Sequence, residues 1–132
     1  MTTPLRTLTA GAGKAVVELP FSLLPVDGFS SVHDPLHVRV LVLDDGEAPL
    51  VITVIDQTSI FDDQIARTRK ILRQTCGVPP ERCLIVASHT FSAPHVLPPD
   101  RVPAAEQEKN ELLAAAVDTA VARAAHDAVR SA

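Results

Sequence analysis

The sequence contains few aromatic residues. Only 3% of its 132 residues are aromatic, all of them phenylalanine, and tryptophan and tyrosine are absent. The core must therefore be built from valine, leucine, isoleucine and alanine. Apolar residues still make up 46% of the chain, which excludes an intrinsically disordered segment. The length fits one domain, spanning residues 1–132, with room for one modest core.

An excess of positive charge is also missing. The 12 lysines and arginines are scattered and are outnumbered by 16 acidic residues, giving a net charge of −4. Nucleic acid is therefore not an expected partner, because binding it needs a basic patch. No apolar run reaches the length of a membrane span. The first residues, "MTTPLRTLTAGAGK", lack the apolar segment of a secretory signal. We therefore expect a cytoplasmic protein.

Several catalytic signatures are absent from the sequence. There is no GxSxG elbow, no HExxH pair and no Walker loop. "GAGKA" (11–15) resembles a phosphate loop only superficially, because it precedes an expected strand instead of opening a helix after one. Cys76 and Cys83 form no metal signature. We expect two reduced, half-buried thiols, and a disulfide across the intervening loop is the alternative.

Three apolar segments in the first half are typical of strands. "KAVVEL" (14–19) follows a Gly-rich turn, "AGAG". Residues 36–43 and 49–56 are rich in β-branched side chains and are separated by an Asp-Gly turn signal, so they predict a β-hairpin. Valines alternate with more polar residues along 36–43, which indicates one wetter face. Residues 49–56 are apolar nearly throughout, which predicts a central strand covered on both faces.

The pattern changes to a helical period after this hairpin. We expect a helix over 60–76, capped by Ser59 and ended by Gly77. Its expected apolar stripe consists of Ile65, Ile71 and Leu72. A further strand is expected at 83–88, parallel to 49–56 with a right-handed crossover, since the three segments form a βαβ unit.

The last quarter of the chain predicts one long helix, over Ala104–Ala132. Its expected buried stripe is Leu113, Val117, Val121, Ala125 and Val129. The helix should lie across the sheet. The expected fold class is therefore α/β, with a mixed sheet of about four strands, one βαβ unit and a long C-terminal helix.

In this arrangement, candidate functional side chains follow the ends of two strands. Asp56 follows "VITVI", and His89 follows "CLIVAS". Ligands of open α/β sheets bind outside the carboxyl ends of parallel strands, and both residues should lie on that edge. A carboxylate and an imidazole there can hold a metal or orient a base. The alternative is structural, with Asp56 capping the following turn and with Ser88, Thr90 and Ser92 satisfying loop amides.

The other histidines are less clearly placed. His95 follows Pro94 and is expected in an exposed loop, and His126 is expected on the surface of the last helix. His33 and His37 flank the long segment 20–35, and long ordered loops are often functional. They approach His89 only if that loop folds over the same edge.

The segment "ASHTFSAPH" (87–95) resembles a motif of the neutral/alkaline non-lysosomal ceramidases. In that family a strand precedes a histidine–threonine–histidine–serine–glycine-or-alanine–proline sequence. "AGAGKAVVELP" is similar to the family's opening strand, and "DPLHVRVLVLDDGEAPLVITVIDQTSI" to its hairpin with a following aspartate. The resemblance spans essentially the whole chain but only the first part of the family's catalytic domain. The matched motif positions are Ser88, His89, Thr90, Ser92, Ala93 and Pro94.

The resemblance implies that His89 is a zinc ligand. Phe91 stands where the family has its second motif histidine. The family's remaining ligands, a histidine, a glutamate and a tyrosine, come later in its chain, as does its nucleophilic serine. A catalytic zinc usually needs three protein ligands. Three interpretations therefore stay open: a partner chain supplies the rest, the chain is a non-catalytic relative, or copies of it combine His89 with His33, His37 or His95.

The sequence thus predicts a subunit or N-terminal half of a ceramidase-like, metal-dependent amide hydrolase, active only with a partner chain. Asp56 and Ser92 are the expected catalytic residues and His89 the zinc ligand. The substrate is expected to be a small amide-containing or lipid-like molecule. The alternative is a non-catalytic binding or structural subunit of a biosynthetic complex. Either way we expect an obligate oligomer, with a separate chain or a second copy, whose interface lies beside His89.

Overall fold

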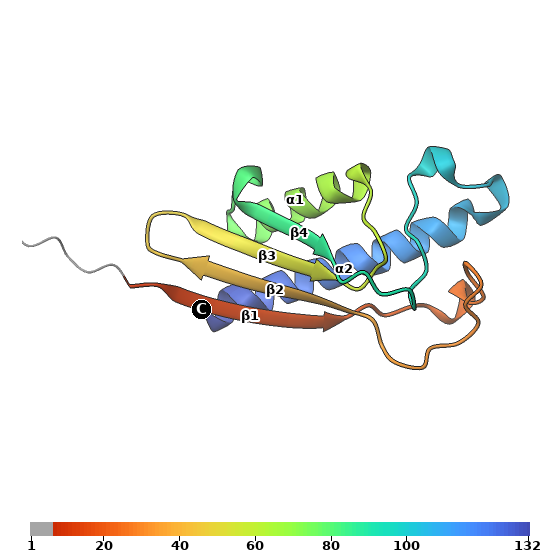
Figure 1. The fold of residues 1–132 in the computed structure, drawn as a ribbon, viewed down its shortest axis with the longest axis horizontal. Helices are drawn as coiled ribbons and strands as arrows, with labels where there is room; N and C mark the ends of the chain where they lie inside the picture. Colours follow the sequence, from red (N-terminus) through yellow and green to blue (C-terminus); the bar gives the residue numbers. More distant parts are fainter. Residues whose placement is uncertain (1–6) are drawn as a thin grey trace, which may run out of the picture.

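A computed structural model describes residues 7–132 as a four-stranded mixed sheet with two helices on one of its faces (Figure 1). The strands are β1 (Thr9–Val16), β2 (His37–Asp44), β3 (Pro49–Ile55) and β4 (Cys83–Ala87), and the helices are α1 (Asp62–Cys76) and α2 (Gln107–Ser131). The strand order is β1-β2-β3-β4; the first two pairings are antiparallel, and β3 and β4 are parallel. This confirms the expected α/β class, hairpin and parallel β3–α1–β4 arrangement.

The core lies between the sheet and the two helices. On β2 the alternate valines Val38, Val40 and Val42 are buried, as the alternation predicts. Neither helix covers the opposite face, where Leu84 and Val86 of β4 are 52% and 42% exposed. The expectation that β3 is covered on both faces is therefore wrong: its position is central, but only every second residue from Val51 to Ile55 is buried.

The first strand begins earlier than the sequence predicted. "AGAG" is part of β1 and not a turn. An added Cβ at Gly11 would lie 1.9 Å from the main-chain oxygen of Ala128, and one at Gly13 would lie 2.0 Å from that of Ala124. These glycines therefore allow α2 to approach the strand closely, a role that a strand glycine also serves.

The two helices also differ in detail from the expected patterns. Ser59 does not cap α1, because the residue that precedes the helix is Phe61, which is extended and makes no side-chain cap. Gly77 ends α1 in the left-handed conformation, at φ 68°, as expected. In α2, Val129 is 42% exposed and does not belong to the buried stripe. The residues that α2 buries are Leu113, Val117, Ala120, Val121, Ala124, Ala125 and Ala128.

The connections are mostly irregular. Four single-turn 3-10 helices interrupt the connections, at Phe21–Leu23, Pro80–Arg82, Pro99–Arg101 and Ala104–Glu106.

Within residues 7–132, neither helix is both long enough and apolar enough to cross a membrane.

Candidate functional site

Asp56 and His89 follow the carboxyl ends of two adjacent parallel strands, as the sequence predicted. Ile55, the last residue of β3, pairs with Ala87, the last residue of β4. The amide of Ser88 continues this pairing and donates to the Ile55 carbonyl at 2.9 Å. Both candidate residues therefore leave the sheet at the same edge, where α/β sheets bind ligands.

Asp56 is held by the neighbouring strand β2. Its Oδ2 accepts a hydrogen bond from the His37 amide at 2.8 Å and lies 3.5 Å from Arg39 Nη1. The Asp56 amide in turn donates to the His37 carbonyl at 3.0 Å. The side chain is only 17% exposed. The carboxylate thus fastens the end of β3 to the start of β2, instead of capping the turn that follows it.

His89 has an unusual backbone and a fixed ring. Its φ is 66°, in the left-handed region that non-glycine residues rarely adopt. Its amide donates to the Gln57 carbonyl at 2.9 Å, and its Nδ1 lies 2.7 Å from the Thr58 carbonyl oxygen. Because a carbonyl only accepts, Nδ1 carries the proton, and Nε2 of the neutral ring keeps its lone pair. The imidazole is exposed and packs at a tilt against Phe91, with the ring centroids 5.0 Å apart.

The segments after β3 and β4 are also joined to each other. Thr58 Oγ1 donates to the Thr90 carbonyl at 2.7 Å. Behind this contact, the buried side chains of Gln57 and Gln64 exchange two hydrogen bonds. Neither glutamine was predicted from the sequence. The only signal was their position, since Gln57 lies two residues after the end of β3 and Gln64 lies on the buried side of α1.

A cavity of about 810 Å³ opens at the same edge of the sheet. The long segment 20–35 forms much of its wall, together with the end of β1. His89, His37 and His95 are not among the residues that line it. The structure therefore brings His33, Asp56 and Ser92 to one cavity but leaves His89 outside it. Its polar lining includes His33, Asp56, Thr90 and Ser92, and its apolar lining includes Leu24, Phe29 and Leu36.

Ser92 is exposed in the loop after β4. Its amide donates to Thr90 Oγ1 at 3.1 Å, which orders the loop. Across residues 7–132 the Ser92 hydroxyl has no hydrogen-bond partner. A nucleophilic serine needs an adjacent base, so these residues alone do not activate it.

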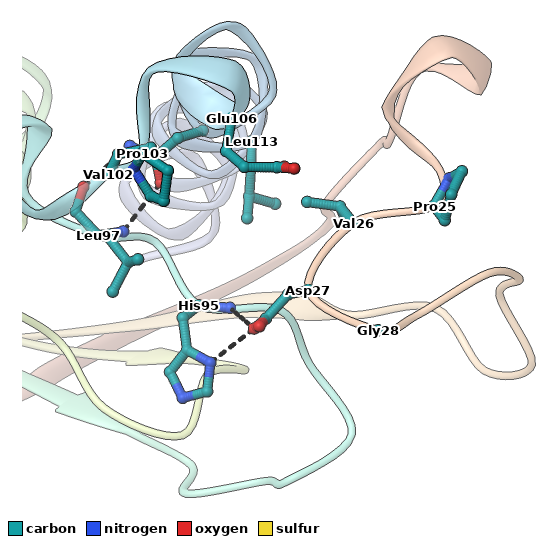
Figure 2. Close-up of a pocket in the computed structure, with 11 residues that line it drawn as sticks. Pro25, Val26, Asp27, Gly28, His95, Leu97, Val102, Pro103, Glu106 and Leu113 are labelled. Carbon is teal, nitrogen blue, oxygen red and sulfur yellow. Dashed lines mark hydrogen bonds and ion pairs between the residues drawn. The ribbon is translucent and has the colours of Figure 1, made fainter.

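A second cavity, of about 460 Å³, lies between the loop at 25–28, the segment after Pro94 and the start of α2 (Figure 2). At its edge, Asp27 Oδ2 accepts from the His95 amide at 2.8 Å and lies 2.6 Å from His95 Nδ1. Burial favours a higher pKa for Asp27, but the hydrogen bonds and charge of His95 outweigh it and lower the pKa below 3.8. His95 is exposed, as expected, and is engaged here, not with His89.

The described residues do not complete a metal centre. Across residues 7–132, no group of three or more histidine, cysteine, aspartate or glutamate side chains could hold an ion. Cys76 and Cys83 are free and partly exposed. Burial is the main cause that raises the pKa of each thiol, so neither is an activated thiolate. His89 is therefore a single available ligand and not a zinc site.

Comparison with family models and with curated proteins found no match. Among solved structures, the chain is similar to a ceramidase complexed with C2, with a TM-score of 0.71 and 20% identity over 96% of this chain. It is also similar to the neutral ceramidase from Pseudomonas aeruginosa, with a TM-score of 0.72 and 19% identity over 97%. The chain covers 22% of each of these proteins, about a fifth of their length. The fold expected from the resemblance is thereby confirmed for this part.

Proposed function

We propose that this chain is one part of a ceramidase-like amide hydrolase whose active site is completed by a partner chain. The observation that carries the proposal is the likeness to solved ceramidases, which extends over 96% of this chain but only 22% of theirs. The position of His89 beside the carboxyl edge of the sheet supports it. At 20% identity the likeness itself concerns the fold, so activity is a proposal that rests on the site.

His89 is the residue proposed to hold zinc. Its Nδ1 is engaged by the Thr58 carbonyl, which leaves Nε2 free to act as a ligand. When bound, zinc would polarise an amide carbonyl and lower the pKa of an attacking group. A catalytic zinc needs about three protein ligands, and residues 7–132 supply no such group. The partner chain is therefore proposed to contribute the others, and metal binding by the isolated chain should be weak or absent.

The large cavity is proposed to take the substrate. Its volume of about 810 Å³ and its mixed lining suit a small amide with an apolar chain, because ligand sites are mostly apolar with a few polar groups. Ser92 and Asp56 lie on its wall. Asp56 would hold the edge in place through His37, while a base from the partner would have to activate Ser92. Phe91, exposed beside His89, adds apolar surface for such a substrate.

The second candidate function is that of a non-catalytic binding or structural subunit of a biosynthetic complex. Two observations favour it. Asp56 is engaged with the main chain of β2, and the Ser92 hydroxyl is hydrogen-bonded to no base among residues 7–132. Such a subunit would use the same fold and cavity for binding and would retain no zinc.

Purification with and without a partner separates the two functions. The chain is purified alone and together with the product of a neighbouring reading frame that encodes the missing histidine, glutamate and tyrosine. Zinc is measured by mass spectrometry, and hydrolysis is followed with a fluorescent short-chain ceramide. We expect stoichiometric zinc and hydrolysis in the complex only, both lost in His89→Ala and both kept in the control His126→Ala on the surface of α2.

Other outcomes decide against the proposal. A stable complex without zinc or hydrolysis would favour the non-catalytic subunit. Stoichiometric zinc that survives dialysis of the isolated monomer would contradict the need for a partner. It would mean that His33, His37 or His95 joins His89 within the chain.

A further inference from the structure

Two buried glutamines stand behind the candidate site. Gln57 is 2% exposed and Gln64 is fully buried. Gln57 Nε2 donates to Gln64 Oε1 at 2.9 Å, and Gln64 Nε2 donates to Gln57 Oε1 at 2.7 Å. Buried amides are costly unless paired, and here each satisfies the other. Packing alone does not explain the pair, because two leucines would fill the same space without polar groups.

The pair fixes the turn between β3 and α1. Gln57 Nε2 makes a further hydrogen bond, to the Ser59 carbonyl at 3.1 Å, and the Gln57 amide donates to the Ile55 carbonyl at 2.8 Å. Gln64 belongs to the first turns of α1. The turn at residues 57–59 is therefore attached to the strand before it and to the helix after it, and its carbonyl groups have little freedom to rotate.

Two of those carbonyls hold His89. The Gln57 carbonyl accepts from the His89 amide at 2.9 Å, and the Thr58 carbonyl lies 2.7 Å from His89 Nδ1. The first contact supports a backbone with φ 66°, a conformation that persists only where its surroundings enforce it. The second contact determines which ring nitrogen carries the proton.

We infer that Gln57 and Gln64 are positioning residues for His89. Their paired amides keep the Thr58 carbonyl on Nδ1, so that Nε2 stays unprotonated and points away from the turn. That Nε2 is presented to a metal rests on the proposed function. That the Thr58 carbonyl fixes the tautomer of His89 does not rest on it, because the tautomer is a property of the metal-free chain. Within residues 7–132, no hydrogen bond joins either glutamine side chain to the His89 ring, so both act through the turn.

The tautomer of His89 tests this inference directly. Long-range ¹H–¹⁵N correlation spectra of ¹⁵N-histidine-labelled protein, at a fixed alkaline pH and without metal, distinguish a protonated Nδ1 from a protonated Nε2. We expect His89 of the wild type to be held in the Nδ1-protonated form. In the double variant Gln57→Leu/Gln64→Leu we expect loss of this preference, to the ratio shown by free histidine at the same pH.

The double variant is chosen because it removes both partners. Replacing both glutamines leaves no unpaired buried amide, whereas Gln64→Leu alone would leave the buried side-chain amide of Gln57 without its hydrogen-bond partner. The matched control is Thr68→Val, one turn further along the buried face of α1, where the hydroxyl has no partner in residues 7–132. It should leave the His89 tautomer unchanged. Circular dichroism and thermal unfolding verify that each variant is folded.

Three results would overturn the inference. They are an Nε2-protonated His89 in the wild type, an unchanged tautomer in a folded double variant, and an equal change in Thr68→Val. The wild-type measurement holds even if the double variant does not fold. In the zinc-loaded complex the double variant should lower zinc affinity about tenfold or more. A wild-type complex without zinc or hydrolysis would contradict the proposed function and leave the tautomer result intact.

Discussion

At the scale of single residues, Asp118 is a half-buried charge that the fold tolerates. It lies on α2 and accepts from Arg67 Nε of α1 at 3.1 Å, while Arg67 Nη1 contacts Asp63 at 3.0 Å. Burial raises the pKa of Asp118 above its ordinary 3.8, although the nearby Arg67 opposes the shift. The ionised carboxylate is therefore less favourable in the folded chain than in the unfolded one.

This predicts a pH-dependent effect of Asp118→Asn. A carboxyl whose pKa is raised on folding contributes stability below its unfolded pKa, and that stability is lost as the pH rises through the folded pKa. The asparagine mimics the neutral acid and keeps an oxygen for Arg67. The free energy of unfolding of Asp118→Asn should therefore exceed that of the wild type only slightly near pH 3 and by more at pH 7. Urea denaturation at the two pH values measures this difference in the free energy of unfolding. A difference that is equal or greater at pH 3 would refute the prediction.

The positions of the candidate residues could be predicted, but their contacts could not. Apolar runs end at Ile55 and Ala87, so the sequence places Asp56 and His89 at one edge. The contact of His89 with the Thr58 carbonyl depends on a φ of 66°, which no local pattern indicates for histidine. The Ser59 cap was wrong because α1 begins only at Asp62, after Phe61, which is extended and makes no side-chain cap.

At the scale of elements, the contact between α2 and β1 depends on glycine. A Cβ at Gly13 would lie 2.0 Å from the Ala124 carbonyl oxygen. That atom belongs to the helix backbone, so a side-chain rotation cannot relieve the clash. The helix or the strand would have to move, and the packing that both make with the core would change with it.

Gly13→Ala is therefore expected to destabilise the chain. Overpacking of this kind typically costs about 1–3 kcal/mol, measured here by urea or thermal unfolding. The matched control is Ala12→Ser, on the exposed face of the same strand, which should change stability by less than about 0.5 kcal/mol. A Gly13→Ala protein as stable as the wild type would show that α2 does not pack against β1 as closely as the structure describes.

The same contact shows why element boundaries were harder to predict than element types. The alternation along β2 and the Asp-Gly signal gave the hairpin correctly. "AGAG" was interpreted as a turn because glycine is a turn residue when taken alone. Its strand role is visible only beside the small residues of α2, more than 100 positions later in the chain. The buried face of α1 was predicted only in part for a similar reason: Leu72 is buried as expected, but Gln64 and Thr68, which are polar, were not predicted to be.

At the scale of the whole molecule, one face of the sheet is left open. Both helices pack on the other face (Figure 1). On the open face Val16, Leu84 and Val86 are 41%, 52% and 42% exposed. Exposed apolar surface of this kind marks interaction sites. Within residues 7–132, the structure offers nothing to cover it.

The charges on this face favour a different chain as the partner. Lys14 lies directly opposite Arg39 across β1 and β2, and like charges so placed repel. Asp56 lies 3.5 Å from Arg39, but Lys14 has no ion pair within residues 7–132. A second copy packed through the same face would add two more cations. A separate chain with a carboxylate opposite Lys14 would relieve the repulsion.

The open face therefore predicts an obligate oligomer. The buried area should be in the obligate class, about 2,000 Å² or more in total, and should extend to the edge that carries His89. Light scattering of the chain with its partner, at micromolar concentration, measures the assembly. Leu84→Lys/Val86→Lys should dissociate it, because charges on an apolar interface are costly to bury, while the control Val129→Lys on the exposed side of α2 should not. A stable monomer in the presence of the partner would defeat the prediction and remove the main support for a shared active site.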